Sequence, residues 1–182
     1  SVSYAAVELA KKIFGSLKGK SILLIGAGEM SELAARHLLR QGVGRILVAN
    51  RTHSRAEAMA EEFQGAAVAF ERFPEVLPEV DIVIASTGAP GYIMTAEMVA
   101  AALRRRRNRL LFLIDIAVPR DIDPAAGEID NVYLYNIDHL QDVVDANREG
   151  RRAEAQKAEA IVAEEALAFG QWFNTLDVVP TI

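Results

Sequence analysis

The residues best suited to chemistry form a glycine-rich loop, Gly26-Ala27-Gly28-Glu29-Met30-Ser31. The loop follows a short apolar segment at 21–25 and precedes an amphipathic segment that extends to residue 41. A tight turn between strand and helix brings bare backbone N–H groups to the positive end of the helix, where they can bind a pyrophosphate. A second apolar segment, 45–50, completes a βαβ unit of about 30 residues, so the sequence predicts a dinucleotide site. Glu29 is unexplained, since a carboxylate repels a pyrophosphate unless it points away.

The end of the second apolar segment indicates which dinucleotide binds. NAD-binding loops usually have Asp or Glu at this corner to accept a hydrogen bond from the ribose 2′-OH. This chain instead has Asn50, Arg51 and Thr52, with Arg55 nearby. Arginine meets phosphate through paired, charge-assisted hydrogen bonds, and this corner has no carboxylate to repel a 2′-phosphate. The sequence therefore favours NADPH over NADH; the alternative is that both arginines are solvated surface charges.

Composition limits the other classes of function. The 182 residues, 51% of them hydrophobic, suffice for one typical domain and an appendage. A net charge of −5 argues against a general nucleic-acid-binding surface, although the arginines at 104–107 and 109 form one basic cluster, at a predicted helix end. The chain has no cysteine for a disulfide or nucleophile, and its three histidines lack metal-site spacing. No apolar run approaches the roughly 20 residues that span a bilayer, so we expect a cytoplasmic protein without membrane contact.

Hydrophobic periodicity predicts a Rossmann-type α/β fold, a doubly wound parallel sheet with a lead-in N-terminal helix and a long C-terminal helix. The predicted strands are 21–25, 45–50, 66–70, 81–85, 110–115 and 132–135, and the predicted helices are 3–14, 29–41, 54–63 and one capped by Thr95. Two loops follow strands, where open α/β sheets place ligands: Ser86-Thr87-Gly88-Ala89 and Asp115-Ile116-Ala117-Val118. Asp115 has a second interpretation, in which it caps the next turn.

A single long helix is predicted from Asp138 to about residue 176, with Asp138-His139-Leu140-Gln141 as its capping box. Its length would be about 60 Å, at about 1.5 Å per residue. Mostly apolar residues recur at three- and four-residue steps, a spacing typical of helix pairing: Ala155, Ala158, Val162, Glu165, Phe169, Trp172 or Phe173, and Leu176. The alternative is a helix folded back on its own domain. The predicted divisions are a lead-in helix (1–18), a Rossmann domain (19–137) and the long helix (138–182).

Five segments together resemble glutamyl-tRNA reductase: GAGEM at 26–30, NRT at 50–52, STGAP at 86–90, FLIDIAVPRDIDP at 112–124 and VVPTI at 178–182. The resemblance implies an oxidoreductase that uses NADPH to reduce glutamyl-tRNA to glutamate-1-semialdehyde, in the porphyrin (tetrapyrrole, heme) pathway through 5-aminolevulinate. It implies a V-shaped homodimer in which a cysteine-bearing catalytic domain, an NADPH domain and a dimerisation domain are joined by a spinal helix. Implied partners are glutamyl-tRNA, a second copy and glutamate-1-semialdehyde aminomutase.

The resemblance also assigns roles to the predicted site residues. Residues 26–31 would hold the pyrophosphate, 50–52 the adenosine ribose and its phosphate, and 86–89 the nicotinamide side. Because the chain lacks a cysteine, we expect the NADPH domain with part of the spinal helix, without the catalytic domain or any catalytic residue, and inactive in isolation. Two alternatives are a shikimate-dehydrogenase-like NADP-dependent reductase domain, which shares the NRT corner, and a non-catalytic NADPH-binding or assembly module.

Overall fold

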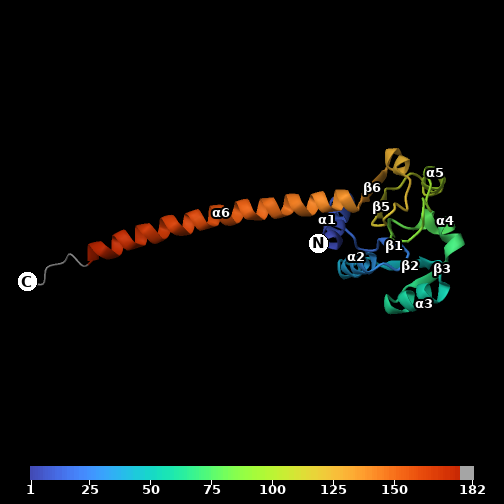
Figure 1. Cartoon of the computed structure of the whole chain (residues 1–182), viewed down its shortest axis with the longest axis horizontal. Helices are drawn as coiled ribbons and strands as arrows, with labels where there is room; N and C mark the ends of the chain where they lie inside the picture. Colours follow the sequence, from blue (N-terminus) through green and yellow to red (C-terminus); the bar gives the residue numbers. More distant parts are fainter. Residues whose placement is uncertain (177–182) are drawn as a thin grey trace, which may run out of the picture. The chain divides into compact units, whose positions relative to one another are not determined.

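The computed structural model describes residues 1–176, and side chains through residue 172, so the VVPTI segment and the side chains of Phe173 and Leu176 lie outside the described part. Within it, a six-stranded parallel sheet has the order β3-β2-β1-β4-β5-β6 (Figure 1). The strands are β1 (Ser21–Ile25), β2 (Arg45–Asn50), β3 (Ala66–Ala69), β4 (Ile82–Ala85), β5 (Leu111–Asp115) and β6 (Val132–Asn136). The helices are α1 (Val2–Phe14), α2 (Glu29–Arg40), α3 (His53–Glu62), α4 (Phe73–Val76), α5 (Ala96–Arg105) and α6 (Ile137–Leu176), with 3₁₀ turns η1 (Phe70–Arg72), η2 (Leu77–Glu79) and η3 (Pro124–Glu128). The predicted Rossmann-type fold is confirmed.

The sheet is the core of the first part of the chain. Every residue of β1 and β5 is buried, as expected for parallel strands covered on both faces. Alternate residues of a strand face opposite sides of the sheet. On one side, Leu23, Val83 and Leu113 share a cluster with Val99 and Leu103 of α5. Helices α1 and α2 pack on each other and contact β5 and β1.

The strand order places a crevice between β1 and β4. The chain runs outward from β1 to β2 and β3 and then returns to β4 on the other side of β1. Ligands of open α/β sheets bind at the carboxyl ends of the strands at such a point. Ile25 and Ala85 end these two strands and are paired in the sheet. The loops that begin at Gly26 and Ser86 therefore leave the sheet side by side.

Several predicted boundaries are off by one residue, among them the start of α6 and the end of β3. The capping box at 138–141 is replaced by one formed by Asn136 and His139: Asn136 Oδ1 accepts the His139 N–H at 3.0 Å, and His139 Nδ1 accepts the Asn136 N–H at 3.3 Å. Because β6 leads into α6 without a loop, the last strand residue becomes the helix cap. The third strand ends at Ala69, and Phe70 opens the turn η1.

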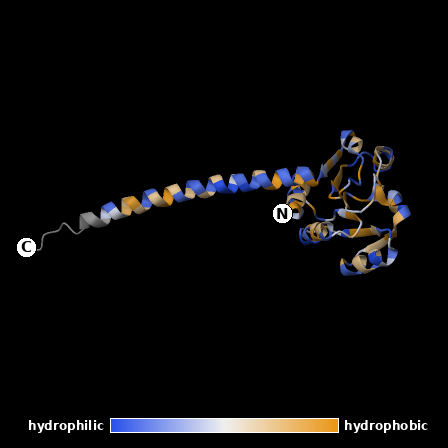
Figure 2. Cartoon of the chain, viewed as in Figure 1, coloured by the Kyte–Doolittle hydropathy of each residue, from blue (hydrophilic) through white to orange (hydrophobic). Residues whose placement is uncertain are grey.

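The chain divides into two compact units, Ser1–Asp142 and Val143–Ile182. The described part of the second unit is the remainder of α6, which is mostly polar over 145–157 and more hydrophobic further on (Figure 2). Its large hydrophobic side chains are exposed, namely Ile161, Val162, Leu167, Phe169 and Trp172. Among residues 1–176, no helix is both long enough and apolar enough to cross a membrane.

Candidate functional site

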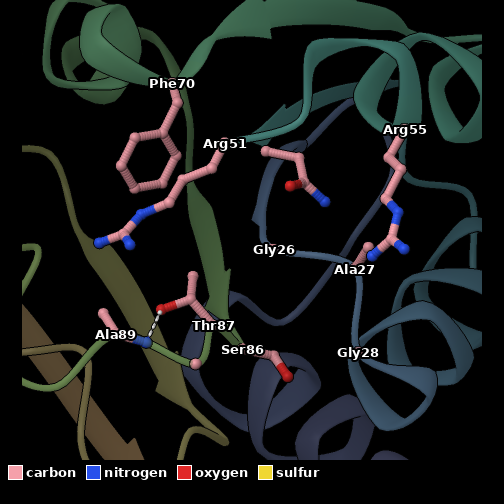
Figure 3. A pocket seen from close by; sticks show the side chains of 11 residues that line it. Gly26, Ala27, Gly28, Arg51, Arg55, Phe70, Ser86, Thr87 and Ala89 are labelled. Atoms are coloured by element: carbon pink, nitrogen blue, oxygen red, sulfur yellow. Dashed lines mark hydrogen bonds between the residues drawn. The ribbon is translucent and has the colours of Figure 1, made fainter.

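A pocket of about 350 Å³ lies where β1, β2 and β4 end (Figure 3). It brings together three of the predicted segments and one residue that the sequence did not indicate, Phe70. The lining residues are Gly26, Ala27, Gly28, Asn50, Arg51, Arg55, Phe70, Ser86, Thr87, Gly88 and Ala89. The predicted residues outside this lining are Glu29, Met30, Ser31, Thr52, Asp115, Ile116, Ala117 and Val118.

Two glycines allow the loops after β1 and β4 to touch. Gly26 has a φ of +93°, and a Cβ on it would lie 2.1 Å from the backbone oxygen of Ser86. A Cβ on Gly28 would lie 2.2 Å from Ser86 Oγ. Gly26 is therefore required where the two loop backbones approach, whereas a side chain at position 28 would displace the Ser86 hydroxyl. The two loops together form one side of the pocket. Any residue with a side chain would fill this cradle.

The start of α2 offers backbone donors to the pocket. Gly28 is the N-cap of α2 and provides no side-chain cap, which leaves helix N–H groups for an anionic ligand. Ser31, buried in the first turn, donates its hydroxyl proton to Gly28 O at 2.6 Å and so fixes the turn. Glu29 is exposed and lies outside the lining, so its carboxylate is no obstacle to an anion in the pocket.

The β2 side of the pocket is cationic. The Arg51 side chain runs beside the Phe70 ring, and Arg55 reaches in from the other side (Figure 3). Asn50 Oδ1 accepts the Thr52 N–H at 3.0 Å and so shapes the turn that leads into α3. Among the lining residues there is no Asp or Glu. The pocket therefore has two positive charges and no carboxylate to oppose an anion.

Two buried carboxylates support the loop at 86–89 from behind. Asp115, 1% exposed, accepts backbone N–H groups from Ala117 at 3.1 Å, Asp121 at 3.0 Å and Ile122 at 2.9 Å. Burial raises the pKa of Asp115, although these hydrogen bonds oppose the shift. Asp121 in turn accepts the Thr87 N–H at 2.7 Å and the Thr87 hydroxyl proton. Asp115 thus caps the turn that follows β5, the second of the two interpretations offered by the sequence.

The remaining residues of the second predicted loop do not reach the pocket lining. Ile116 and Ala117 are buried, and Val118 is exposed. The Ile116 N–H donates to Ala85 O at 2.9 Å, which ties the start of this loop to the end of β4. Ile116 is therefore tied to the residue that precedes the 86–89 loop and does not reach the pocket itself.

The basic cluster at the C-terminal end of α5 contains exposed arginines and one buried arginine. Arg104, Arg105, Arg107 and Arg109 are exposed, whereas Arg106 is 2% exposed and hydrogen-bonded to backbone carbonyls and to Asp81. Arg106 is therefore a structural residue and is not available to a nucleic-acid phosphate.

Comparison with known proteins gives relatives that match the whole chain. The family model described as shikimate / quinate 5-dehydrogenase matches residues 8–143. Glutamyl-tRNA reductase of Syntrophus aciditrophicus (strain SB) is 72% identical over 182 residues, which are 100% of this chain and 43% of that protein. The chain therefore spans less than half the length of this relative.

Solved structures agree with the fold. Glutamyl-tRNA reductase from Methanopyrus kandleri superposes with a TM-score of 0.82 at 38% identity, covering 97% of this chain and 44% of that one. The nucleotide binding domain of glutamyl-tRNA reductase from Thermoplasma volcanium has a TM-score of 0.62 at 19% identity, covers 84% of this chain and 96% of that one, and supports the fold alone.

Proposed function

The chain belongs to the family described as shikimate / quinate 5-dehydrogenase. Within this family, we propose that it is the NADPH-binding domain of a glutamyl-tRNA reductase, because its 72% identical relative is one. The resemblance stated from the sequence is confirmed by the high identity over the whole chain. The family match supports the shikimate-dehydrogenase alternative in fold only. The observation that carries the cofactor assignment is a glycine-lined pocket with two arginines and no carboxylate.

The pocket suits each part of NADPH. The N–H groups at the start of α2 would bind the pyrophosphate. Arg51, Arg55 and Asn50 would bind the adenosine ribose and its 2′-phosphate. The loop 86–89 would hold the nicotinamide side, with Asp115 and Asp121 as its supports.

In the whole protein, this domain would present NADPH to the glutamyl group of glutamyl-tRNA, and the product would be glutamate-1-semialdehyde. The aminomutase would receive this product. Bound NADPH supplies a hydride from its nicotinamide. The residues of this chain bind and orient the cofactor. The chain has no cysteine, so the nucleophile of the reaction would come from another part of the enzyme. We propose that the enzyme is cytoplasmic.

Replacing Arg51 with alanine tests the cofactor assignment. We expect the unmutated chain to bind NADPH more tightly than NADH, and the variant to lose that preference. Hydrogen bonds to a charged group contribute about 1.5–3 kcal/mol, which corresponds to roughly 10- to 150-fold in affinity. Titration calorimetry with both cofactors measures the ratio. Arg45→Ala, at the exposed other end of β2, is the matched control and should keep the preference. Equal affinities in the unmutated chain would contradict the assignment.

We also propose that α6 pairs with a second copy in the dimer. Val162 and Phe169 lie seven residues apart, 67% and 61% exposed, as expected of a seam that contacts a partner. An unpartnered helix loses the tertiary contacts that stabilise helices in water. Hydrogen exchange should therefore show protection of 151–176 that rises with protein concentration.

Val162→Glu should abolish this rise, because a carboxylate would be buried in the seam. Ala160→Glu, an exposed position outside the seam, is the control and should keep it. Strong protection that is independent of concentration in a monomer would refute the pairing of α6.

A further inference from the structure

Phe70 and Arg51 are brought together by the register of two strands. The last residues of β2 and β3, Asn50 and Ala69, are paired in the sheet. Arg51 and Phe70 are the first residues after these two strands, so both side chains start from neighbouring points at the pocket edge. The Arg51 Cζ lies 5.5 Å from the centre of the Phe70 ring, and both residues line the pocket (Figure 3).

Phe70 is held in place by the core. Its ring meets that of Phe73 edge to face, with 5.7 Å between the ring centres and an interplanar angle of 62°. Phe73 is 3% exposed and belongs to the hydrophobic core, on which the half-buried Phe70 also packs. The ring is therefore a fixed wall of the pocket.

Arg51, in contrast, is exposed, and the contact of its guanidinium within the described residues is the Phe70 ring. A cation–π contact with a ring involves no hydrogen-bond acceptor, so the N–H groups of Arg51 can still make a bidentate contact with an anion. No carboxylate lines the pocket to compete for these N–H groups. The contact with Phe70 also restricts the rotamers of Arg51 before any ligand binds. Less side-chain entropy is then lost when the anion binds.

We propose that Phe70 is a positioning residue for cofactor selectivity, which holds the Arg51 guanidinium ready for the 2′-phosphate of NADPH. This inference rests on the proposed NADPH site. Phe70 acts through Arg51, so its effect is confined to the cofactor that carries the phosphate. A ring that instead stacked on the adenine would support NADPH and NADH alike.

The test replaces Phe70 with leucine, which keeps apolar bulk against Phe73 and removes the π face, and with tyrosine, which keeps the face. Cation–π contacts are worth about 0.5–2 kcal/mol, so Phe70→Leu should weaken NADPH binding by about 2- to 30-fold in calorimetry. NADH affinity should be unchanged, and Phe70→Tyr should bind both cofactors like the unmutated chain. In an Arg51→Ala background, Phe70→Leu should have no further effect on NADPH.

Three results would overturn the inference while the NADPH site stands: equal losses for both cofactors, no loss for NADPH, or an undiminished loss in the Arg51→Ala background. An unmutated chain that does not prefer NADPH would overturn the site and the inference together. Thermal unfolding of each variant identifies any that loses its fold. If Phe70→Leu does, Phe70→Met, which also keeps apolar bulk without a π face, replaces it in the same comparisons.

Discussion

Arg106→Met is expected to lower the free energy of unfolding by about 3–5 kcal/mol, the cost of leaving one partner of a buried ion pair alone. The Arg106 side chain is fully buried and lies 3.2 Å from Asp81 Oδ1. Its guanidinium also donates to the backbone oxygens of Leu77 (3.3 Å), Pro78 (3.4 Å), Val80, Arg109 (2.8 Å) and Leu110 (2.6 Å). One side chain therefore joins η2, the start of β4 and the segment before β5.

The loss is large because the backbone oxygens of Leu77, Val80 and Leu110 share this buried donor with Asp81 Oδ1. Pro78 O also accepts from Arg109 Nη2, at 3.2 Å. Burial lowers the pKa of Arg106, as does the Arg109 charge, while Asp81 raises it. An arginine nevertheless keeps its charge in a protein. Methionine would fill much of the volume but leave Asp81 and the carbonyls without their shared donor.

Arg109→Met is the control, since Arg109 is also close to Asp81, at 3.9 Å, but its side chain is 59% exposed. Exposed ion pairs contribute about 0–1 kcal/mol, so this variant should change stability little. Urea unfolding followed by circular dichroism compares the two. Equal, small losses would show that water or Arg109 replaces the buried guanidinium.

The features that could be predicted from the sequence are those with a local signal. The glycine loop, the apolar runs of the strands and the non-acidic end of β2 each lie within a few consecutive residues, and the parallel sheet follows from their alternation. The boundaries of these predicted strands and helices agree with the structure to within one residue.

Two of the features that were missed, the roles of Arg106 and Phe70, depend on segments distant in sequence. Arg106 reads as one of several surface cations, and only the carbonyls of η2, nearly thirty residues earlier, make it structural. Phe70 reads as the end of an apolar strand, and its role depends on the pairing of β3 with β2. The cap formed by Asn136 and His139 lacks the Ser/Thr and Glu/Gln pattern by which capping boxes are recognised.

Gly26→Ala is expected to cost about 2–6 kcal/mol of folding stability, the sum of a strained φ angle and an overpacked contact. The added Cβ would lie 2.1 Å from Ser86 O and 2.7 Å from Ser86 C, both backbone atoms at the end of β4. Backbone held in the sheet cannot move aside as a side chain can. Gly15→Ala separates the two contributions, because Gly15 has a φ of +72° but nothing within 4 Å of an added Cβ. That variant should lose only the strain contribution, about 1–3 kcal/mol.

A second substitution at Ser86 distinguishes the two glycines of the loop. Gly28→Ala would clash with the Ser86 side chain, its Oγ at 2.2 Å and its Cβ at 3.3 Å. Ser86→Gly removes both atoms, so it should restore stability to Gly28→Ala and leave Gly26→Ala as unstable as before. Urea unfolding of the single and double variants gives the two coupling energies. Rescue of both would mean that the loops after β1 and β4 move apart, and the close approach that shapes this side of the pocket would not be a fixed property of the fold. A Gly28→Ala variant as stable as the unmutated chain would mean that the Ser86 hydroxyl rotates aside while the loops stay in place.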